Sequence, residues 1–279
     1  MAVWPKLAEQ LKGRTAWVIL CDFDGTLAPI VLRPEKARMP ARTRQLLRRL
    51  LAHRGVFLGV ISGRSLRDVR GRVGIPGLIY AGNHGFELAG RGLRFTHPAA
   101  IQHRSYLRKI CRKLEKVVAG THGSQVEWKD LTASVHWRGV KASERGALKR
   151  RLATVLAPEE AAGRLRLTRG LCVLEIRPPV DWGKGAVIDW LLDRGIFPKG
   201  SFLIFIGDDR TDEEAYRAVA REGGLTARVG PCAWRSRAQY QLRDPEEVQA
   251  WLQAVMRMLA RSARQHKKEE SDELVSRGD

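Results

Sequence analysis

Two clusters of acidic residues carry the strongest chemical signal in this sequence. In Asp22-Phe23-Asp24-Gly25-Thr26, two aspartates follow an apolar run and stand two positions apart. If that run is a strand, both carboxylates lie on the same side of the pleat. Burying two like charges together normally requires a cation, and oxygen ligands without histidine or cysteine favour Mg2+. The spacing therefore indicates a magnesium site, and an exposed turn at Gly25 is the alternative.

The second acidic cluster follows another apolar run, residues 202–206. Its sequence is Gly-Asp-Asp-Arg-Thr-Asp-Glu-Glu over residues 207–214. A buried strand that ends in these acids could add carboxylates to the same metal site. The alternative is a helix start in which Thr211 and Glu214 form a capping box, and both interpretations can hold together.

Two further polar residues stand where a phosphate group could bind. Ser62, in Ser-Gly-Arg, follows the apolar run 56–61, and Lys184 opens a helical pattern. A hydroxyl beside a helix N-terminus and a lysine ammonium can each contact an anion. Taken alone, a helix cap also explains Ser62, and a solvated side chain also explains Lys184.

These residues lie at the ends of elements that alternate between strand and helix patterns. Continuous apolar runs, typical of buried strands, cover residues 16–23, 56–61, 78–81 and 202–206. Helical patterns cover residues 43–53, 66–73 and 184–192. The alternation predicts an α/β fold with a doubly wound, mostly parallel sheet, whose strand ends bring the polar residues together.

A different pattern interrupts this core. A long helix, two alternating segments, a second helix and a further strand are expected over residues 99–119, 125–129, 131–138, 143–156 and 172–177. This stretch predicts an inserted α+β lid, or cap, domain. The predicted domains are a core over 1–98, the cap over 99–179, the rest of the core over 180–260 and a charged, disordered tail over 261–279.

Taken in their order along the chain, the motifs at Asp22, Ser62, Lys184 and residues 207–214 resemble the four motifs of the haloacid dehalogenase superfamily of phosphatases. The resemblance implies a Rossmann-like core. The resemblance implies that Asp22 is the nucleophile that forms an aspartyl-phosphate and that Asp24 is the general acid and base. Ser62 and Lys184 would hold the phosphoryl group. The resemblance assigns Mg2+ to a set of aspartates: Asp22, Asp24 through its main-chain oxygen, Asp208 and Asp212. Whether Asp209 or Asp212 contacts the ion directly stays open.

Segments outside these motifs resemble trehalose-6-phosphate phosphatases, from about residue 15 to residue 230. They include Tyr-Ala-Gly-Asn-His-Gly-Phe-Glu at 80–87 and Leu-Glu-Ile-Arg-Pro at 174–178. Asn83 is one departure, because many members carry serine there. The resemblance implies hydrolysis of trehalose 6-phosphate to trehalose and phosphate. Another sugar phosphate or a glycosyl-phosphoglycerate is the alternative substrate.

The resemblance implies that the cap supplies sugar specificity. The family's sugar-binding positions fall on Glu127, Lys129, Arg138 and Glu175. Period-2 geometry is compatible with this role, because Glu127 and Lys129 share one face of a strand. Cross-strand salt bridges on a solvated face are the alternative. His84 either organises its loop or contacts the substrate near the phosphate.

The composition limits the other function classes. The chain has 50 lysines and arginines against 30 acids, a net charge of +20. The basic residues are spread along the chain without interleaved aromatic residues, which disfavours nucleic acid as the ligand. The four cysteines are scattered, so neither a zinc site nor a disulfide framework is expected. A non-catalytic binding domain that keeps only the fold is the competing class.

The chain is expected to be a cytoplasmic monomer. Its first ten residues lack the features of a secretory signal, and no apolar run reaches the length of a membrane span. The expected partners are a small sugar phosphate and, as a functional link, a trehalose-6-phosphate synthase, with no nucleic acid and no membrane.

Overall fold

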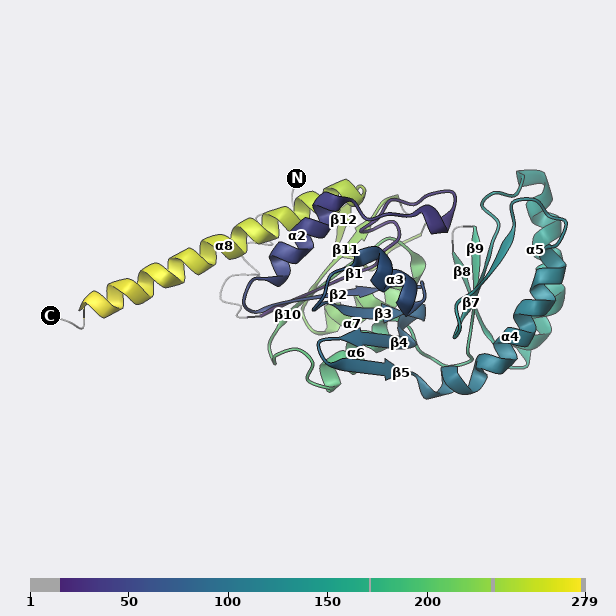
Figure 1. Ribbon diagram of the computed structural model, residues 1–279, viewed down its shortest axis with the longest axis horizontal. Helices are drawn as coiled ribbons and strands as arrows, with labels where there is room; N and C mark the ends of the chain where they lie inside the picture. The colour runs from purple at the N-terminus through teal and green to yellow at the C-terminus, as the bar shows by residue number, and fades with distance from the viewer. Residues whose placement is uncertain (1–15, 171, 232–233, 277–279) are drawn as a thin grey trace.

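The computed structural model describes residues 16–170, 172–231 and 234–276. It contains an eight-stranded sheet and a separate four-stranded sheet, which lie in two bodies side by side (Figure 1). The N-terminal segment on which the expectation about a secretory signal rested lies outside the described residues, as does Cys232.

The larger sheet forms the core domain. In spatial order its strands are β12 (Tyr240–Leu242), β11 (Leu225–Val229), β10 (Phe202–Gly207), β1 (Trp17–Cys21), β2 (Val56–Ile61), β3 (Ile79–Gly82), β4 (Glu87–Gly90) and β5 (Leu93–Thr96). Pairing is parallel from β12 through β3, and β4 and β5 add an antiparallel edge. Since β1 lies between β10 and β2, the ends of these three strands meet at one edge of the sheet.

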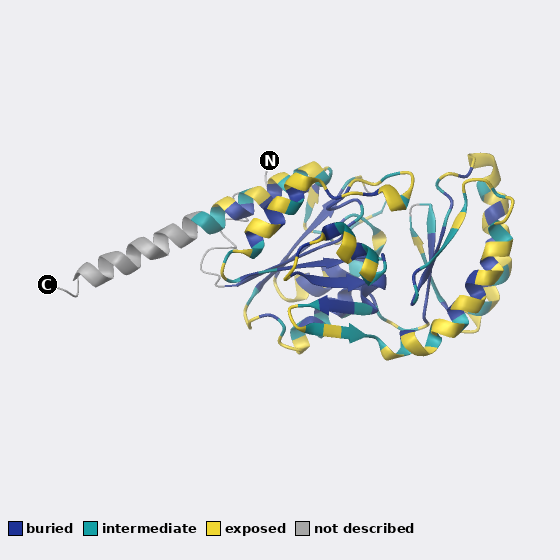
Figure 2. Ribbon diagram, in the orientation of Figure 1, coloured by how far each residue is buried: buried dark blue, intermediate teal, exposed yellow. Residues whose placement is uncertain are grey.

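Helices cover both faces of the core sheet, because β1 is apolar on both sides. Ile19 and Cys21 face one apolar cluster, whereas Val18 and Leu20 face the other. The first face packs against α2 (Ala41–Leu51), α3 (Leu66–Val73) and the first part of α8 (Pro245–Ser276). The second face packs against α6 (Lys184–Asp193) and α7 (Glu213–Arg221). Figure 2 shows the buried strands between exposed helix surfaces.

The smaller sheet forms the cap and is antiparallel. Its strands, in spatial order, are β6 (Gln125–Trp128), β7 (Ala133–His136), β9 (Val173–Arg177) and β8 (Arg166–Gly170). Apolar residues of one face, including Val135 and Ile176, pack on α4 (Pro98–Val118) and α5 (Ala142–Ala161). Alternation along each strand directs Glu127, Ser134 and Glu175 to the opposite face. That face lies opposite the core domain, across the cleft that both domains line.

The predicted fold class is confirmed: a largely parallel, doubly wound sheet with an inserted α+β cap. The sequence pattern does not predict β4, β5, β8, β11 or β12, because these strands are short or carry mixed polar residues. Three short 3-10 helices were also not predicted: η1 (Pro34–Lys36), η2 (Asn83–Gly85) and η3 (Arg210–Asp212). The exact domain boundaries stay a prediction.

Helix α8 continues to Ser276 and so includes much of the segment predicted to be a disordered tail. The disorder of residues 261–279 stays a prediction. Residues 261–276 are rich in Lys, Arg and Glu, which have high intrinsic helix propensity.

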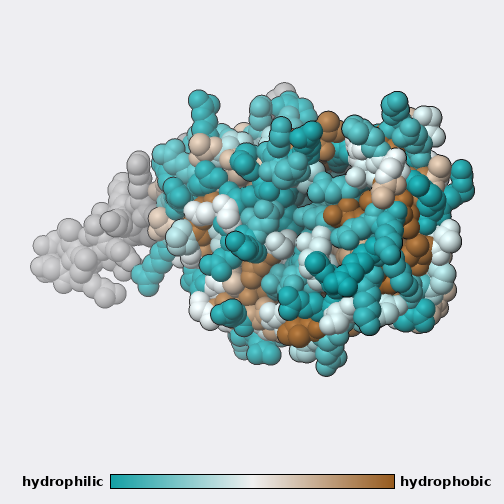
Figure 3. Space-filling model, turned by 45° about the vertical axis from the view of Figure 1, so that its right-hand side comes forward, coloured by the Kyte–Doolittle hydropathy of each residue, from teal (hydrophilic) through white to brown (hydrophobic). Residues whose placement is uncertain are grey.

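Hydrophilic side chains cover most of the face shown in Figure 3, with small apolar patches between them. None of the described helices combines the length and apolar character needed to cross a membrane.

Candidate active site

The polar motifs converge where β1, β2 and β10 end. The Asp22 amide donates a hydrogen bond to the carbonyl of Ile206, 2.8 Å away, which ties the first motif to the end of β10. Gly25 has a φ of +77°, and a Cβ at this position would overlap the Asp208 carboxylate. Glycine therefore permits the close approach of the two acidic clusters.

A buried lysine lies between these acids. The Lys184 ammonium is 2.9 Å from Asp22 Oδ1 and 2.6 Å from Asp212 Oδ1. Burial alone would lower the pKa of Lys184, but the two carboxylates raise it above its usual value. Lys184 is therefore a fixed positive charge beside Asp22, and the solvated alternative for this residue does not apply.

Three carboxylates form a compact group that could hold a cation. Among the described residues, Asp22, Asp208 and Asp212 each place one carboxylate oxygen within 4.8 Å of the other two. Burial and the neighbouring acids raise the pKa of Asp22, even though Lys184 opposes the shift. The same causes raise the pKa of Asp208 well above its usual range. An excess of buried negative charge with only oxygen donors fits a hard divalent cation.

Asp212 has a second role in the backbone of the site. Its Oδ2 accepts hydrogen bonds from the amides of Asp208 and Asp209, each at 2.9 Å. The capping box therefore joins Asp209 and Asp212 at the start of η3, where the sequence had indicated Thr211 and Glu214. With Oδ1 bound to Lys184, both oxygens of Asp212 are already engaged.

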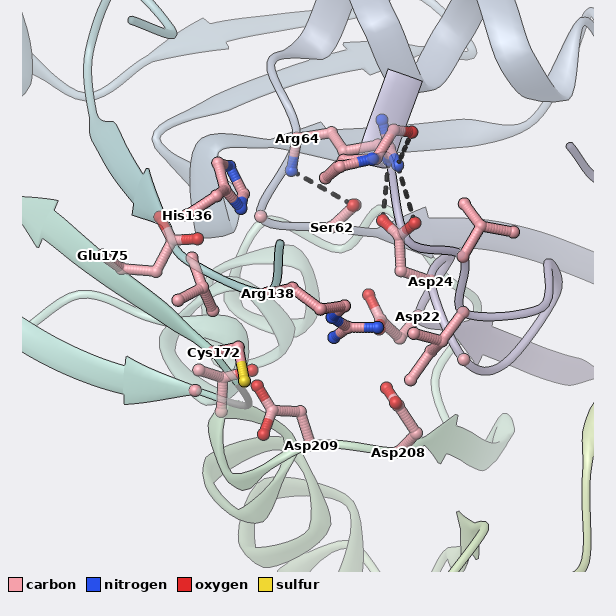
Figure 4. Close-up of a pocket in the computed structure, with 18 of the residues that line it drawn as sticks. Asp22, Asp24, Ser62, Arg64, His136, Arg138, Cys172, Glu175, Asp208 and Asp209 are labelled. Carbon is pink, nitrogen blue, oxygen red and sulfur yellow. Dashed lines mark hydrogen bonds and ion pairs between the residues drawn. The ribbon is translucent and has the colours of Figure 1, made fainter. Parts of the chain in front are cut away.

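Arg64, for which the sequence pattern predicts no role, binds Asp24. The Arg64 guanidinium donates two hydrogen bonds to the Asp24 carboxylate, at 2.6 and 2.7 Å (Figure 4). It also binds Asp68 at 2.7 Å, and its backbone amide donates to Ser62 Oγ at 3.2 Å. The only sequence signal for Arg64 was its place in Ser-Gly-Arg. A bidentate pair of this kind fixes both the position and the orientation of the carboxylate.

A cleft of about 1510 Å3 separates the core acids from the cap. Its lining contains all but one of the residues expected at the site: Asp22, Asp24, Ser62, His84, Glu127, Lys129, Arg138, Glu175, Lys184 and Asp208. The exception is Asp212, which is fully buried behind Lys184. Figure 4 shows Arg138 and Glu175 extending from the cap toward the core acids. The structure thus places both sets of predicted residues around one cavity.

The cap wall of the cleft is a buried network of charges. Lys129 Nζ lies 3.3 Å from both oxygens of Glu175, and Ser134 Oγ donates to Glu175 Oε2 at 2.8 Å. Burial raises the pKa of Glu175, but the Lys129 charge, together with His84 and the Ser134 hydrogen bond, lowers it below its usual value. At the mouth, His136 Nε2 is 2.8 Å from Glu127 Oε2. This wall therefore presents fixed charges and hydrogen-bonding groups to the cavity.

His84 lies between the core acids and this cap network. It adopts a left-handed conformation with a φ of +56°, and its amide donates to the carbonyl of Ser62 at 2.9 Å. Nε2 is 3.6 Å from Glu175 Oε2, and neither buried ring nitrogen has a hydrogen-bond partner among the described residues. Burial lowers the pKa of His84 to about 4. The ring is therefore neutral at pH 7, and its geometry is compatible with both roles considered for it.

We expect His84→Asn to reduce the acid sensitivity of folding. Because the folded-state pKa lies below the usual 6.5, neutral His84 stabilises the fold above pH 6.5, and that contribution disappears as the pH falls toward 4. The stability difference between wild type and variant should narrow by about 2 kcal/mol between pH 7 and pH 5. Urea unfolding at both pH values measures it. The matched control is His122→Asn, at an exposed histidine. If the unfolding free energies of wild type and His84→Asn change equally between the two pH values, His84 is not a buried histidine with a lowered pKa.

Together, the doubly wound core, the acids at its strand ends, the buried lysine and the inserted cap define a phosphatase of the haloacid dehalogenase superfamily. A family model described as Trehalose-phosphatase matches residues 20–246. The chain therefore belongs to the trehalose-phosphatase family, and its activity is that of a trehalose-6-phosphate phosphatase.

Individual relatives agree with this assignment. The chain is 32% identical over 268 residues to "Probable trehalose-phosphate phosphatase D" of Arabidopsis thaliana, which covers 92% of this chain and 71% of the relative. It is also 32% identical over 268 residues to "Trehalose 6-phosphate phosphatase RA3" of Zea mays, covering 90% and 73%. Among solved structures, the C-terminal domain of C. albicans trehalose-6-phosphate phosphatase superposes with a TM-score of 0.80. That match covers 90% of this chain and 96% of the domain at 22% identity, which supports the fold.

Proposed function

We propose that the cleft hydrolyses trehalose 6-phosphate in two steps, through a covalent phosphate ester on Asp22. The observation that carries this proposal is the Lys184 bridge between Asp22 and Asp212 at the base of a cleft whose opposite wall holds Lys129 and Glu175. One end of the cleft offers a nucleophile beside a fixed positive charge. The other offers charged groups suited to sugar hydroxyls.

In the first step, an Asp22 oxygen attacks phosphorus and the bond between phosphorus and the sugar oxygen breaks. Asp24 donates a proton to that leaving oxygen, so trehalose departs neutral. In the second step, Asp24 removes a proton from water, which attacks phosphorus and releases inorganic phosphate from Asp22. Ser62 donates a hydrogen bond to the phosphoryl group, and Lys184 offsets its charge.

We infer that Mg2+ is the cation of the acid group. Asp22 and Asp208 would hold it with their carboxylates, and Asp24 with its main-chain oxygen. Lys184 and two backbone amides engage both Asp212 oxygens, so Asp212 would contact the ion at most through a bridging water. When bound, the ion supplies charge neutralisation for the phosphoryl oxygens.

The cap residues are assigned to the sugar. Glu127, Lys129 and Glu175 face the cleft from the strand face that carries no helix, and Arg138 follows the end of β7. Buried charged groups bind hydroxyls selectively, because a substrate that lacks one leaves them unpaired. Cross-strand pairing also uses these side chains, but their common direction into the cavity favours a substrate role.

The cellular setting is an inference from the reaction. The substrate is a small sugar phosphate, which a trehalose-6-phosphate synthase would supply in the cytoplasm. We propose that the chain acts as a monomer, since core and cap of one chain supply every residue assigned to the site.

A substrate panel tests the proposed specificity. Phosphate release would be measured from trehalose 6-phosphate, sucrose 6-phosphate, glucose 6-phosphate and a mannosyl phosphoglycerate, with and without Mg2+. Preference for trehalose 6-phosphate that requires Mg2+ is expected. Preference for another member would keep the mechanism and overturn the role assigned to the cap.

Metal binding has its own predicted signature. Because Mg2+ would neutralise buried acids in the folded state only, adding it should raise the melting temperature of the wild type. Asp208→Asn should lose most of that shift, whereas the exposed Asp193→Asn should retain it. Scanning calorimetry checks this prediction: melting temperatures are measured first in EDTA and then at Mg2+ concentrations that increase in about 5- to 10-fold steps. An equal shift in both variants would contradict the metal assignment.

A further inference from the structure

The side chain of Asn83 connects the core wall of the cleft to the cap wall. Asn83, on η2, is fully buried and adopts a left-handed conformation with a φ of +51°. Its Nδ2 donates to the carbonyl of Lys129 in the cap at 3.0 Å and to Glu87 Oε2 in the core at 2.7 Å. Its Oδ1 accepts from Thr132 Oγ1 in the cap at 2.6 Å. Two acceptors on one side and a hydroxyl donor on the other fix the orientation of the amide.

The cap segment held by Asn83 is the tight turn between β6 and β7. The amide of Lys129 donates to the carbonyl of Thr132 at 3.0 Å, which closes the turn. Asp130 has a φ of +74°, and Leu131 is buried against Phe86 of the core. Asn83 thus binds the backbone at one end of the turn and a side chain at the other. The turn is fixed against the core by a buried amide and an apolar contact.

The turn carries one of the residues assigned to the sugar. From this position the Lys129 ammonium donates to the carbonyl of Gly63 at 3.0 Å and pairs with Glu175. Gly63 directly follows Ser62, which is assigned to the phosphate, and the amide of Asn83 donates to the carbonyl of Arg64 at 2.6 Å. Asn83 is therefore hydrogen-bonded both to the loop that holds the phosphate-binding serine and to the turn that holds the sugar-binding lysine.

We propose that Asn83 is a positioning residue that sets the spacing between the phosphate site of the core and the sugar site of the cap. The proposal rests on the proposed function of Lys129 and Ser62. A fixed spacing selects substrates in which the phosphate and the sugar hydroxyls are the correct distance apart. Asn83 itself touches no reacting atom.

Asn83→Ala tests this role with two substrates. Trehalose 6-phosphate must engage both sites, whereas p-nitrophenyl phosphate carries no sugar and needs only the core site. Displacement of Lys129 should lower kcat/KM for trehalose 6-phosphate about 10- to 100-fold, mostly through a higher KM. The kcat/KM for p-nitrophenyl phosphate should stay within about 3-fold, because the nucleophile and Lys184 are untouched.

Thr132→Val removes the same hydrogen bond from the cap side and preserves the shape of the side chain. Like Asn83→Ala, it should lower kcat/KM for trehalose 6-phosphate more than kcat/KM for p-nitrophenyl phosphate. The double variant should be less impaired than the product of the single effects predicts, since both changes break one connection. Thr154→Val, on the exposed side of α5, is the matched control.

Three results would overturn the proposal. An equal loss with both substrates would indicate a merely structural role for Asn83. Unchanged selectivity in Thr132→Val would do the same, and this variant decides the question if Asn83→Ala does not fold. A wild type that hydrolyses p-nitrophenyl phosphate but not trehalose 6-phosphate would reject the proposed sugar specificity first, and the positioning role with it.

Discussion

Asp22→Asn should reduce the release of phosphate from trehalose 6-phosphate by more than about 10^4-fold, because an amide cannot form the covalent phosphate ester. The substitution preserves the size of the side chain, and Lys184 keeps its 2.6 Å partner Asp212. Single-turnover measurements with saturating Mg2+ would show the loss in the chemical step. The wild type should accumulate a labile phosphoprotein during turnover, and the variant should not.

The control for this prediction is Asp189→Asn, at a half-exposed aspartate on α6 that pairs with Arg221 at 2.7 Å. It removes a carboxylate of the same type far from the cleft and should leave activity within about 2-fold, since exposed pairs contribute little. Substantial turnover by Asp22→Asn, with the fold intact by circular dichroism, would reject Asp22 as the nucleophile. A second carboxylate would then have to perform the attack.

The sequence predicted the core of the site because its chemistry coincides with simple backbone rules. A buried parallel strand appears as an apolar run, and the residues after it must lie at the carboxyl edge of the sheet. Asp22, Ser62 and Asp208 each follow such a run, so their convergence needed no tertiary information. The cap sheet was accessible for a similar reason, since alternation along 125–129 separates its two faces.

The connections between these parts could not be predicted from spacing. Arg64 binds Asp24 across 40 positions of sequence, and Asn83 binds Lys129 across 46. An arginine or asparagine in a loop has many possible partners, so only the folded arrangement selects one. Local sequence spacing can also mislead: Thr211 and Glu214 have capping-box spacing, but the capping box forms two residues earlier, between Asp209 and Asp212.

Lys184→Met should lower kcat about 10^2- to 10^3-fold, because the phosphoryl group would lose a fixed positive charge in a buried site. It should also cost about 3–5 kcal/mol of folding stability in the absence of metal, since Asp22 and Asp212 would remain buried without their shared cation. Steady-state kinetics and urea unfolding measure the two effects separately. The exposed Lys199→Met removes a lysine of equal size from the surface and should change neither quantity.

The pH and metal dependence of Lys184→Met distinguish its role from ordinary packing. Burial already raises the pKa of Asp22 above the usual 3.8 in the presence of Lys184, and removing that charge should raise it further. A carboxylate whose folded-state pKa is raised stabilises the fold most below pH 3.8, and that stability declines as the pH rises. The metal-free variant should therefore lose stability relative to wild type as the pH rises above about 7, where Asp22 of the wild type ionises beside Lys184 and Asp22 of the variant does not. Mg2+ should restore much of this stability but little of the rate, because the ion neutralises the acids without replacing the ammonium beside the phosphate. A pH-independent stability loss that Mg2+ does not reverse would instead assign Lys184 a packing role.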